Sequence, residues 1–525
     1  MITDNIIGTS TAGTSAQHFT AVNPATNETL PGEFQAATRA EVEAAVRLAT
    51  EAAPAFRNSS PEARAAFLDA IADGILALGD TLVHRAMAES GLPEGRIRGE
   101  RGRTMNQLKL FATLIREGHW VEATIDHALP DRQPLPKADI RKMLVALGPV
   151  VVFGASNFPL AFSTAGGDTA SALAAGCPVI VKAHPAHPGT SSLIAEAIRG
   201  AAAATNMPAG VFSHLLDEGL KVGQTLVQHP DVKAVAFTGS LRGGRALYDL
   251  AAARPEPIPV FAEMGSINPV LLSPGALKSR GKVLAHQMAG SVCLGVGQFC
   301  TNPGLLLALA GEETDAFLGW MGEALANTAS ATMLTSGIAG NFRKLQAEAR
   351  ATDGVTTVIE PPSSLTGAEG MPSLATVSAT EFIAHPRLRE EVFGPFTLLV
   401  QCRDTAEMAA VIDSLEGQLT GSVMAEADED AWLHGLQDIL ARRVGRLIYN
   451  GVPTGVEVCH SMHHGGPYPA TTDSRFTSVG TSAIQRFARP VCFQNWPDSL
   501  LPPALQEANP LGILRFVDGK HRLPS

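Results

Sequence analysis

The chain has 525 residues and a mass of 54.9 kDa, more than one hydrophobic core of ordinary size can organise, so two or three domains are expected. Hydrophobic residues make up 45% and charged residues 17%, a balance typical of a globular α/β protein and not of a disordered or fibrous one. The net charge of −11 excludes a global basic field that would hold nucleic acid or an anionic membrane.

Six cysteines are scattered without paired or CxxC spacing, which indicates a reducing compartment and not a disulfide scaffold. The first residues lack the basic and apolar regions of a secretory signal. The most apolar run, residues 143–162, is interrupted by Pro149 and Pro159, so we interpret it as a buried strand and a loop. We therefore expect a cytoplasmic protein with no membrane and no nucleic-acid partner.

The first part of the chain reads as helical. Residues 41–78 combine apolar and polar side chains at helical spacing. Within them, Ser60, Pro61 and Glu62 predict a helix start, because a hydroxyl caps the first turn, proline fits it and an acid faces the positive end of the dipole. Further helix is expected through residue 89 and over residues 103–115, before a proline-rich break at 130–136.

Short valine-rich runs follow, and they predict strands at residues 144–147, 150–153, 179–181 and 235–237. Continuously apolar strands separated by helical stretches are typical of a parallel sheet covered on both faces. The last three runs end in polar or glycine-containing turns, where open α/β sheets bind ligands, so we interpret this part as a nucleotide-binding domain. No GxGxxG fingerprint follows a strand. Residues 265–448 predict a second α/β domain.

Residues 295–304, GVGQFCTNPG, hold Cys300 between a glycine-rich approach and an Asn-Pro-Gly turn. Glycine permits close approaches that a β-carbon would forbid, so this loop can present a thiol to a small molecule. A buried structural thiol explains the segment equally well when it is taken alone, because free cysteine is among the most buried residue types.

Three other segments set a polar residue among glycine, proline and apolar neighbours: SNFP at 156–159, FAEMG at 261–265 and EEVFGP at 390–395. Taken alone, Asn157 is better explained as the cap of a helix beginning near Pro159. Glu263 ends an apolar strand, where a carboxylate is unfavourable unless it has a partner. Glu391 and Phe393 taken alone fit an ordinary turn before a strand.

Together with Cys300, these segments resemble the aldehyde dehydrogenase superfamily and, within it, the bacterial 2,5-dioxovalerate (α-ketoglutarate semialdehyde) dehydrogenases. The likeness covers roughly residues 19–497, and its subfamily segments are GERGRT at 99–104, DRQPLP at 131–136, VKAHPAHPGT at 181–190 and FTGSLRGG at 237–244. It implies an α/β, aldehyde dehydrogenase-like fold with two doubly wound parallel-sheet domains, one for the cofactor and one catalytic. A small β bridging element would pair protomers into a homodimer or homotetramer.

The resemblance also implies a discontinuous domain order. The segments are 1–129 and 148–263 for the cofactor domain, 264–447 for the catalytic domain, 448–485 for a return to the cofactor domain, and 130–147 with 486–525 for the bridging element and a C-terminal arm.

The resemblance makes Cys300 a nucleophile that forms a thiohemiacetal and then a thioester with an aldehyde. The Asn157 side chain and the Cys300 N–H would hold the oxyanion, each donor contributing on the order of 3 kcal/mol. Glu263 would be the base that activates water for hydrolysis. The implied reaction is the NAD(P)-dependent oxidation of an aldehyde to an acid, here 2,5-dioxopentanoate to 2-oxoglutarate.

Cofactor contacts are implied at five positions of this sequence: Lys182 for the adenosine ribose, Gly239 and Ser240 near the pyrophosphate, and Glu391 and Phe393 for the nicotinamide ribose. NAD-preferring relatives often carry a glutamate where this chain has Pro185. No acid occurs between Lys182 and Ser192 to repel a 2′-phosphate, so we expect NADP as cofactor, with NAD possible.

The predicted substrate residues are less specific. Phe158, Phe162 and Phe299 would wall the aldehyde channel, with core packing as the alternative. Arg101 is chosen as the cation for a distal carboxylate, because guanidinium offers a planar fork, although a surface role fits it too.

No metal site is predicted. The histidines at 460, 463 and 464 are interpreted as solvated loop residues, since no ligand scheme is tied to them beyond Cys459.

Three other functions stay open. A medium- or long-chain (fatty) aldehyde dehydrogenase would use the same scaffold. An acyl-CoA-forming enzyme would not need Glu263 as a base, so the presence of Glu263 argues against it. A non-enzymatic binding protein is disfavoured because both Cys300 and Glu263 are present.

Overall fold

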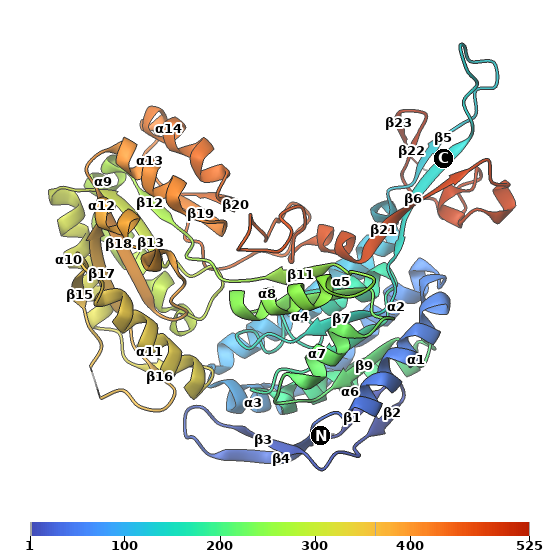
Figure 1. Cartoon of the computed structure of the whole chain (residues 1–525), viewed down its shortest axis with the longest axis horizontal. Coiled ribbons are helices and arrows are strands. Elements are labelled where there is room, and N and C mark those ends of the chain that lie inside the picture. Colours follow the sequence, from blue (N-terminus) through green and yellow to red (C-terminus); the bar gives the residue numbers. More distant parts are fainter. Residues whose placement is uncertain (1–2, 363, 524–525) are drawn as a thin grey trace.

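The computed structural model describes residues 3–362 and 364–523, which form two α/β units and a projecting β-sheet (Figure 1). The first sheet contains, in spatial order, β11 (Val260–Glu263), β10 (Ala234–Thr238), β7 (Val150–Phe153), β8 (Val179–Lys182), β9 (Phe212–Leu215), β1 (Asn5–Ile7) and β2 (Ser10–Ala12). Pairing is parallel from β11 to β9 and antiparallel at β1 and β2.

Helices cover both faces of this sheet. They are α1 (Arg39–Arg57), α2 (Pro61–Ala77), α3 (Gly79–Ser90), α4 (Glu94–Glu117), α5 (Gly167–Ala175), α6 (Pro188–Ala204), α7 (Lys221–Gln228) and α8 (Leu241–Ala252). Alternate residues of β7 show the two layers. Val150 and Val152 pack with α2 to α6, whereas Val151 packs with α1, α7 and α8. The predicted helix start is confirmed, since Ser60 Oγ accepts from Ala63 N at 3.1 Å and Pro61 opens α2.

The second sheet contains, in spatial order, β15 (Thr356–Ile359), β17 (Ser373–Ser378), β18 (Phe396–Cys402), β13 (Leu305–Leu309), β12 (Val270–Leu272), β19 (Gln418–Met424) and β20 (Val444–Tyr449). Only the β15–β17 pair among these described strands is antiparallel. One face packs on α9 (Pro274–Cys293) and α10 (Glu312–Ala326), and the other on α11 (Ser336–Arg350), α12 (Ala379–Ala384), α13 (Thr405–Ser414) and α14 (Asp430–Ala441).

A third sheet projects from the molecule, at the upper right of Figure 1, and contains β21 (Ala488–Gln494), β6 (Ile140–Ala146), β5 (Thr124–Asp126), β22 (Arg515–Val517) and β23 (Lys520–Arg522). The apolar run 144–147 was expected to continue the parallel series, and this is wrong. β6 pairs antiparallel with β5 and β21, because Pro149 and Gly148 separate it from β7. The proline-rich tail after Pro497 was predicted to be an extended arm or a surface segment; it folds back and packs Leu501, Leu505 and Ile513 against β5.

The predicted α/β architecture is confirmed: two parallel-sheet units with helices on both faces, and a small β element. The division into functional domains stays a prediction, and β5 joins the projecting sheet although it precedes residue 130. Across residues 3–362 and 364–523, no helix combines the length and the apolar character that crossing a membrane requires.

Candidate active site

Cys300 lies on the loop between α9 and β13, after a turn with an unusual backbone. Gly295, Val296 and Gly297 all have positive φ, at 57°, 57° and 65°. Val296 is strained there, because a β-branched residue rarely adopts this region. A β-carbon on Gly297 would overlap the carbonyl carbon of Gly394, so only glycine allows the two loops to approach.

Asn268 fixes the backbone around the nucleophile. Its Nδ2 donates to the carbonyl oxygens of Cys300 and Asn302, both at 2.9 Å. Its Oδ1 accepts from Ser266 Oγ at 2.9 Å and from Thr420 Oγ1 at 3.0 Å. Since Asn268 is fully buried, these bonds are shielded from water and hold the Cys300 loop against β12 and β19.

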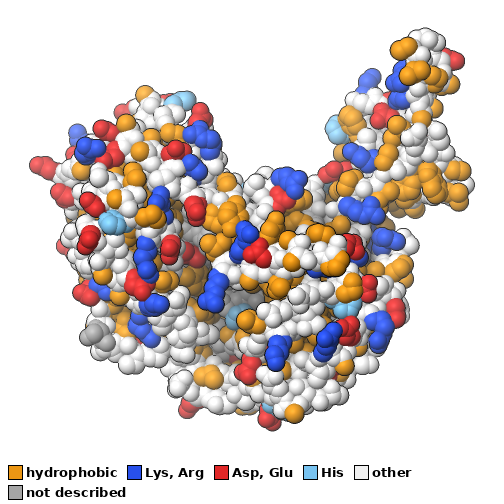
Figure 2. Space-filling model, viewed as in Figure 1, with side chains coloured by type: hydrophobic (Ala, Val, Ile, Leu, Met, Phe, Trp, Pro, Cys, Tyr) orange, Lys and Arg blue, Asp and Glu red, His pale blue; other side chains and the backbone are white. Residues whose placement is uncertain are grey.

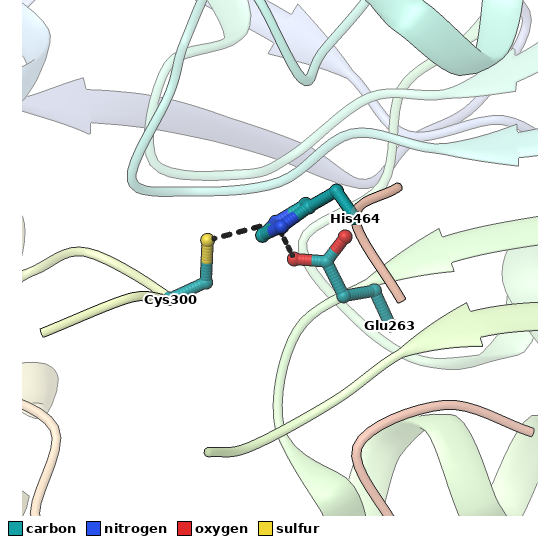
Figure 3. A group of neighbouring side chains, drawn as sticks. All are labelled: Glu263, Cys300 and His464. Carbon is teal, nitrogen blue, oxygen red and sulfur yellow. Dashed lines mark hydrogen bonds and ion pairs between the residues drawn. The ribbon is translucent and has the colours of Figure 1, made fainter. Parts of the chain in front are cut away.

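A thiol, an imidazole and a carboxylate meet at the boundary of the two α/β units (Figure 3). Cys300 Sγ lies 3.4 Å from His464 Nε2, and the same nitrogen lies 2.9 Å from Glu263 Oε1. The other carboxylate oxygen of Glu263, which ends β11, accepts a hydrogen bond from Ser478 Oγ. Glu263 therefore has the buried partners that its place on an apolar strand requires.

His464 was interpreted as a solvated loop residue, and this is wrong. It is 0% exposed, and its backbone N–H donates to Thr477 Oγ1 at 2.8 Å. The polar neighbourhood of His464 in the sequence concealed this burial, because its partner Glu263 belongs to a distant strand. The need of Glu263 for a partner was the one feature that pointed to a group of this kind.

Cys300 and Glu263 both face the same nitrogen of His464, Nε2, and this arrangement indicates the role of the imidazole. In a hydrolase triad the imidazole uses one nitrogen for the nucleophile and the other for the carboxylate. Here Nε2 faces both groups, and Nδ1 is buried with no partner among the described residues. An unpaired N–H costs more than an unpaired lone pair, so we assign the proton to Nε2, the nitrogen that lies close to both Cys300 Sγ and Glu263 Oε1. His464 thus holds the carboxylate in place.

Electrostatics place the proton on sulfur and the charge on the carboxylate. Burial raises the pKa of the Cys300 thiol well above its ordinary value, and the Glu263 carboxylate raises it further. Burial also acts to raise the pKa of Glu263, but the neighbouring His464 imidazole and the hydroxyl of Ser478 outweigh it and leave that pKa lowered. An ionised Glu263 can therefore accept a proton.

Asn157 lies beside the nucleophile loop and does not cap a helix. The helix expected near Pro159 does not form, and α5 begins at Gly167. Instead Asn157 Nδ2 donates to the carbonyl of Gln298 at 3.2 Å, two residues before Cys300. An amide has two N–H groups, so one remains for an oxyanion.

The three predicted channel phenylalanines are in contact. Phe158 lies 5.2 Å from Phe162 and 5.3 Å from Phe299, measured between ring centroids. Arg101, the predicted carboxylate-binding residue, points elsewhere and donates to the carbonyl of Gly79 at 3.1 Å. Arg96 contacts the rings instead.

Two helix N-termini, those of α6 and α8, lie near the predicted cofactor residues. Buried Glu89 occupies that of α6, accepting from Gly189 N at 2.8 Å and Thr190 N at 2.7 Å. The start of α8 is open, because Gly239 and Ser240 are exposed at the end of β10. The Gly239 N–H donates to Glu263 O at 3.0 Å and the Gly243 N–H to Ser240 Oγ at 3.2 Å, so the N–H groups that suit a pyrophosphate are those of Leu241 and Arg242 in the first turn of α8.

Lys182 and Glu391 lie at the other cofactor positions. Burial lowers the pKa of Lys182 to about 8, and its Nζ donates to Asp217 O at 2.7 Å. Glu391 and Phe393 line a pocket together with Ser266, Gly297 and Phe299. Burial raises the pKa of Glu391 to about 7, and Ser266 N approaches it at 3.4 Å.

The same thiol, imidazole and carboxylate are the one group within residues 3–362 and 364–523 whose ligand atoms, all within 4.8 Å of one another, could hold a metal ion. Three ligands of these types suit zinc. The bonds of Glu263 to His464 and Ser478 occupy that carboxylate already, which favours proton transfer as its use.

A buried thiol with an ionised carboxylate beside it, near an exposed helix N-terminus, is the set of groups that a cysteine-dependent oxidoreductase requires. Residues 11–468 match the aldehyde dehydrogenase family, and the chain belongs to that family.

Two curated relatives are similar over nearly the whole length. The alpha-ketoglutaric semialdehyde dehydrogenase 2 of Azospirillum brasilense is 53% identical over 516 residues, covering 98% of each chain. The alpha-ketoglutaric semialdehyde dehydrogenase of Acinetobacter baylyi is 43% identical, covering 93% of this chain and 92% of its own. A solved 1-pyrroline-5-carboxylate dehydrogenase has a TM-score of 0.80 at 20% identity, covering 94% of this chain and 92% of its own, and confirms the predicted fold.

Proposed function

We propose that this protein oxidises α-ketoglutarate semialdehyde (2,5-dioxopentanoate) to 2-oxoglutarate, with NADP as the preferred cofactor. The observation that carries the proposal is the meeting of Cys300, His464 and Glu263, which supplies a nucleophile and a base within one buried group. The two relatives of 53% and 43% identity support the choice of substrate.

The first step is attack of Cys300 Sγ on the aldehyde carbon. The raised pKa of the thiol means that its proton must be transferred as the C–S bond forms, and the ionised Glu263, with a carboxylate oxygen within 4.8 Å of the sulfur, can accept it. The thiohemiacetal oxyanion then receives the free N–H of Asn157 and the backbone N–H of Cys300. Asn268 keeps that backbone oriented through its bonds to two neighbouring carbonyls.

The chemistry that a bound nicotinamide supplies is acceptance of the hydride from the thiohemiacetal carbon. Cys300 is left as a thioester, which water must hydrolyse. Glu263 first releases the thiol proton to solvent and then accepts the proton of that water, while His464 and Ser478 contact its two oxygens. The product carboxylate leaves, and the thiol recovers a proton.

The preference for NADP is inferred from the residues at the end of β8 and directly after it. Pro185 offers no carboxylate to a ribose 2′-hydroxyl, and Lys182 is the buried cation at the end of that strand. Glu391 and Phe393 would hold the nicotinamide end, beside Cys300. Kinetics with NADP and NAD test this preference, and a larger kcat/KM with NAD would contradict it.

The test of the substrate is a panel of aldehydes of increasing length, each with and without a terminal carboxylate. We expect the highest kcat/KM for 2,5-dioxopentanoate, with 2-oxoglutarate as the product. The contact of Phe158, Phe162 and Phe299 favours a second candidate, a medium- or long-chain aldehyde. A rise of kcat/KM with the length of neutral aldehydes would select that candidate.

The projecting sheet supports assembly into a homodimer or homotetramer. Hydrophobic side chains gather on it in Figure 2, and Leu135 and Trp496 are 69% and 51% exposed. Exposed apolar groups on an arm with open strand edges at β21 and β23 are suited to pairing with a second copy. Light scattering tests this, with a monomer as the contradicting result.

A further inference from the structure

One face of α4 carries two arginines toward Phe158, Phe162 and Phe299, the rings predicted to wall the aldehyde channel. Arg96, Glu100 and Arg103 follow one another at i, i+4 and i+7, so they share a face of the helix. Arg101 is rotated by about 140° from Arg96 and about 160° from Arg103 at 3.6 residues per turn. This rotation explains why Arg101 reaches Gly79 instead of the channel.

The two arginines border a continuous aromatic wall that ends at the residue before the nucleophile. The Arg103 guanidinium carbon lies 5.7 Å from the Phe162 ring centroid. The Arg96 guanidinium carbon lies 4.4 Å from Phe158 and 4.6 Å from Phe299. Stacking of this kind holds each guanidinium plane in one orientation and leaves its edge for hydrogen bonds.

Glu100, the carboxylate between them, cannot neutralise both cations. Its Oε1 accepts from Leu160 N at 2.8 Å and Ala161 N at 3.0 Å, and its Oε2 lies 3.5 Å from Arg96 Nε. These bonds fasten the channel loop to α4. Two guanidinium groups share this one buried carboxylate, which leaves a net positive charge on the channel wall.

The Arg103 guanidinium has N–H groups without a partner among the described residues. Its Nη1 donates to the carbonyl of Val456, and its Nε is buried without a partner among the described residues. Glu457, the other acid that acts on it, is exposed to solvent. Burial lowers the pKa of Arg96 and of Arg103, which shows that each cation is held at a cost that an anion would remove.

We infer that Arg96 and Arg103 form the subsite for the carboxylate at the far end of the aldehyde. The inference rests on the proposed function, because the ligand is the terminal carboxylate of an ω-semialdehyde acid such as 2,5-dioxopentanoate. The edge of each guanidinium donates to the carboxylate, while the phenylalanines contact the methylene groups between the two ends. The subsite thereby selects acidic over neutral aldehydes of equal length.

The experiment compares Arg96→Gln and Arg103→Gln with the matched control Arg101→Gln on the same helix. Two aldehydes of the same chain length, 2,5-dioxopentanoate and pentanal, report the selectivity. We expect the ratio of their kcat/KM values to fall on the order of 100-fold in each of the first two variants, chiefly through KM for the acid. The ratio is expected to stay at the wild-type value in Arg101→Gln.

Equal losses on both aldehydes would overturn the inference, since they would mean that the arginines only shape the wall. An unchanged ratio would overturn it as well. Arg103→Lys guards against a folding defect, because it keeps the charge without the fork and is expected to fall between the wild type and Arg103→Gln. Thermal melts of all the variants accompany the kinetics.

A second readout separates this subsite from the proposed substrate. Glutarate, a five-carbon dicarboxylate, is expected to inhibit pentanal oxidation competitively in the wild type and about tenfold more weakly in Arg103→Gln. If the wild type oxidises pentanal but not 2,5-dioxopentanoate, the proposed function fails while arginine-dependent inhibition by glutarate still supports the subsite. Inhibition that is equal in all the variants would contradict the subsite alone.

Discussion

The two sides of Cys300 are built in opposite ways. On one side the two oxygens of Glu263 contact His464 Nε2 and Ser478 Oγ, and all three side chains are buried. On the other side Gly297 and Gly394 bring two loops together beside a cavity where Glu391 has one backbone contact, at 3.4 Å. The first side is complete in the free protein, whereas the second gains its contacts when a ligand enters.

This difference matches two chemical demands. A base must keep its geometry through both halves of the reaction, so its supports are fixed beforehand. A cofactor must enter and withdraw to let water reach the thioester, so its side needs space and a flexible, glycine-permitted backbone. Variants on the first side should therefore change the chemical steps, and variants on the second should change binding.

The largest effect is expected when the sulfur of Cys300, which both sides share, is removed. In Cys300→Ala, oxidation should fall on the order of 10⁶-fold, because no covalent intermediate can form. Cofactor binding, measured by fluorescence titration, should stay close to the wild type. Measurable turnover in this variant would show that the two sides can work without the sulfur.

Glu263→Gln should slow turnover by roughly 10²- to 10⁴-fold, the range for loss of a general base. Acylation can use other proton acceptors, but hydrolysis of the thioester cannot. We therefore expect a rapid burst of reduced cofactor followed by a slow steady state, visible in stopped-flow absorbance. A loss without a burst would mean that Glu263 is needed before the hydride leaves.

Gly297→Ala tests the close approach on the other side. A side chain there must adopt φ near 65° and would overlap Gly394, which costs more than the about 1–2 kcal/mol of the left-handed backbone alone. We expect a lower Tm and slower alkylation of Cys300 by iodoacetamide. Gly290→Ala is the control, because that exposed position in α9 has open space and should gain stability.

His464→Leu should reduce kcat about tenfold at neutral pH and move the acid limb of its pH profile upward. The sign follows from Glu263, whose pKa His464 lowers. Without that partner the pKa rises, and the carboxylate needed for hydrolysis is lost at a higher pH. His464→Gln retains an N–H donor and should recover part of the activity. If the acid limb stayed at its wild-type pH, His464 would not be the residue that lowers the pKa of Glu263.

The smallest effect concerns Glu391, whose pKa is raised to about 7. As the pH rises from 6 to 7.5 this carboxyl ionises and becomes a stronger acceptor for ribose hydroxyls, so the Kd for the cofactor should fall a few-fold. NAD is the proper probe, because it lacks a 2′-phosphate that titrates in the same range. Glu391→Gln should give a Kd that does not change with pH.

Local features of the sequence predicted much of this fold. Short valine runs correctly located β7, β8 and β10, and Ser60 with Pro61 located the start of α2. The resemblance brought Cys300, Glu263 and Asn157 together; in the structure Cys300 and Glu263 belong to one buried cluster, and Asn157 bonds to the Cys300 loop at Gln298. Each of these rests on a residue and its immediate neighbours.

The features that could not be predicted depend on the direction in which a side chain points or on residues far away in the sequence. Arg101 and Arg103 are both arginines in one helical segment, and only the helix phase decides which faces the channel. His464 becomes buried because Glu263 of another strand receives it. Residues 144–146 of β6 are as apolar as β7, yet the antiparallel partners of β6 put them in a different sheet. Sequence pattern carries no information on these pairings.

The partners of Glu263 come late in the chain: Ser478 follows it by 215 residues, and His464 follows Cys300 by 164. At 5–20 residues per second, the ribosome needs roughly 10–30 seconds to pass from the nucleophile to its histidine. Both large sheets can form in that interval, but the reactive centre cannot. A prematurely terminated chain would thus carry a bare thiol and no complete catalyst, so the order of synthesis itself delays the onset of chemistry.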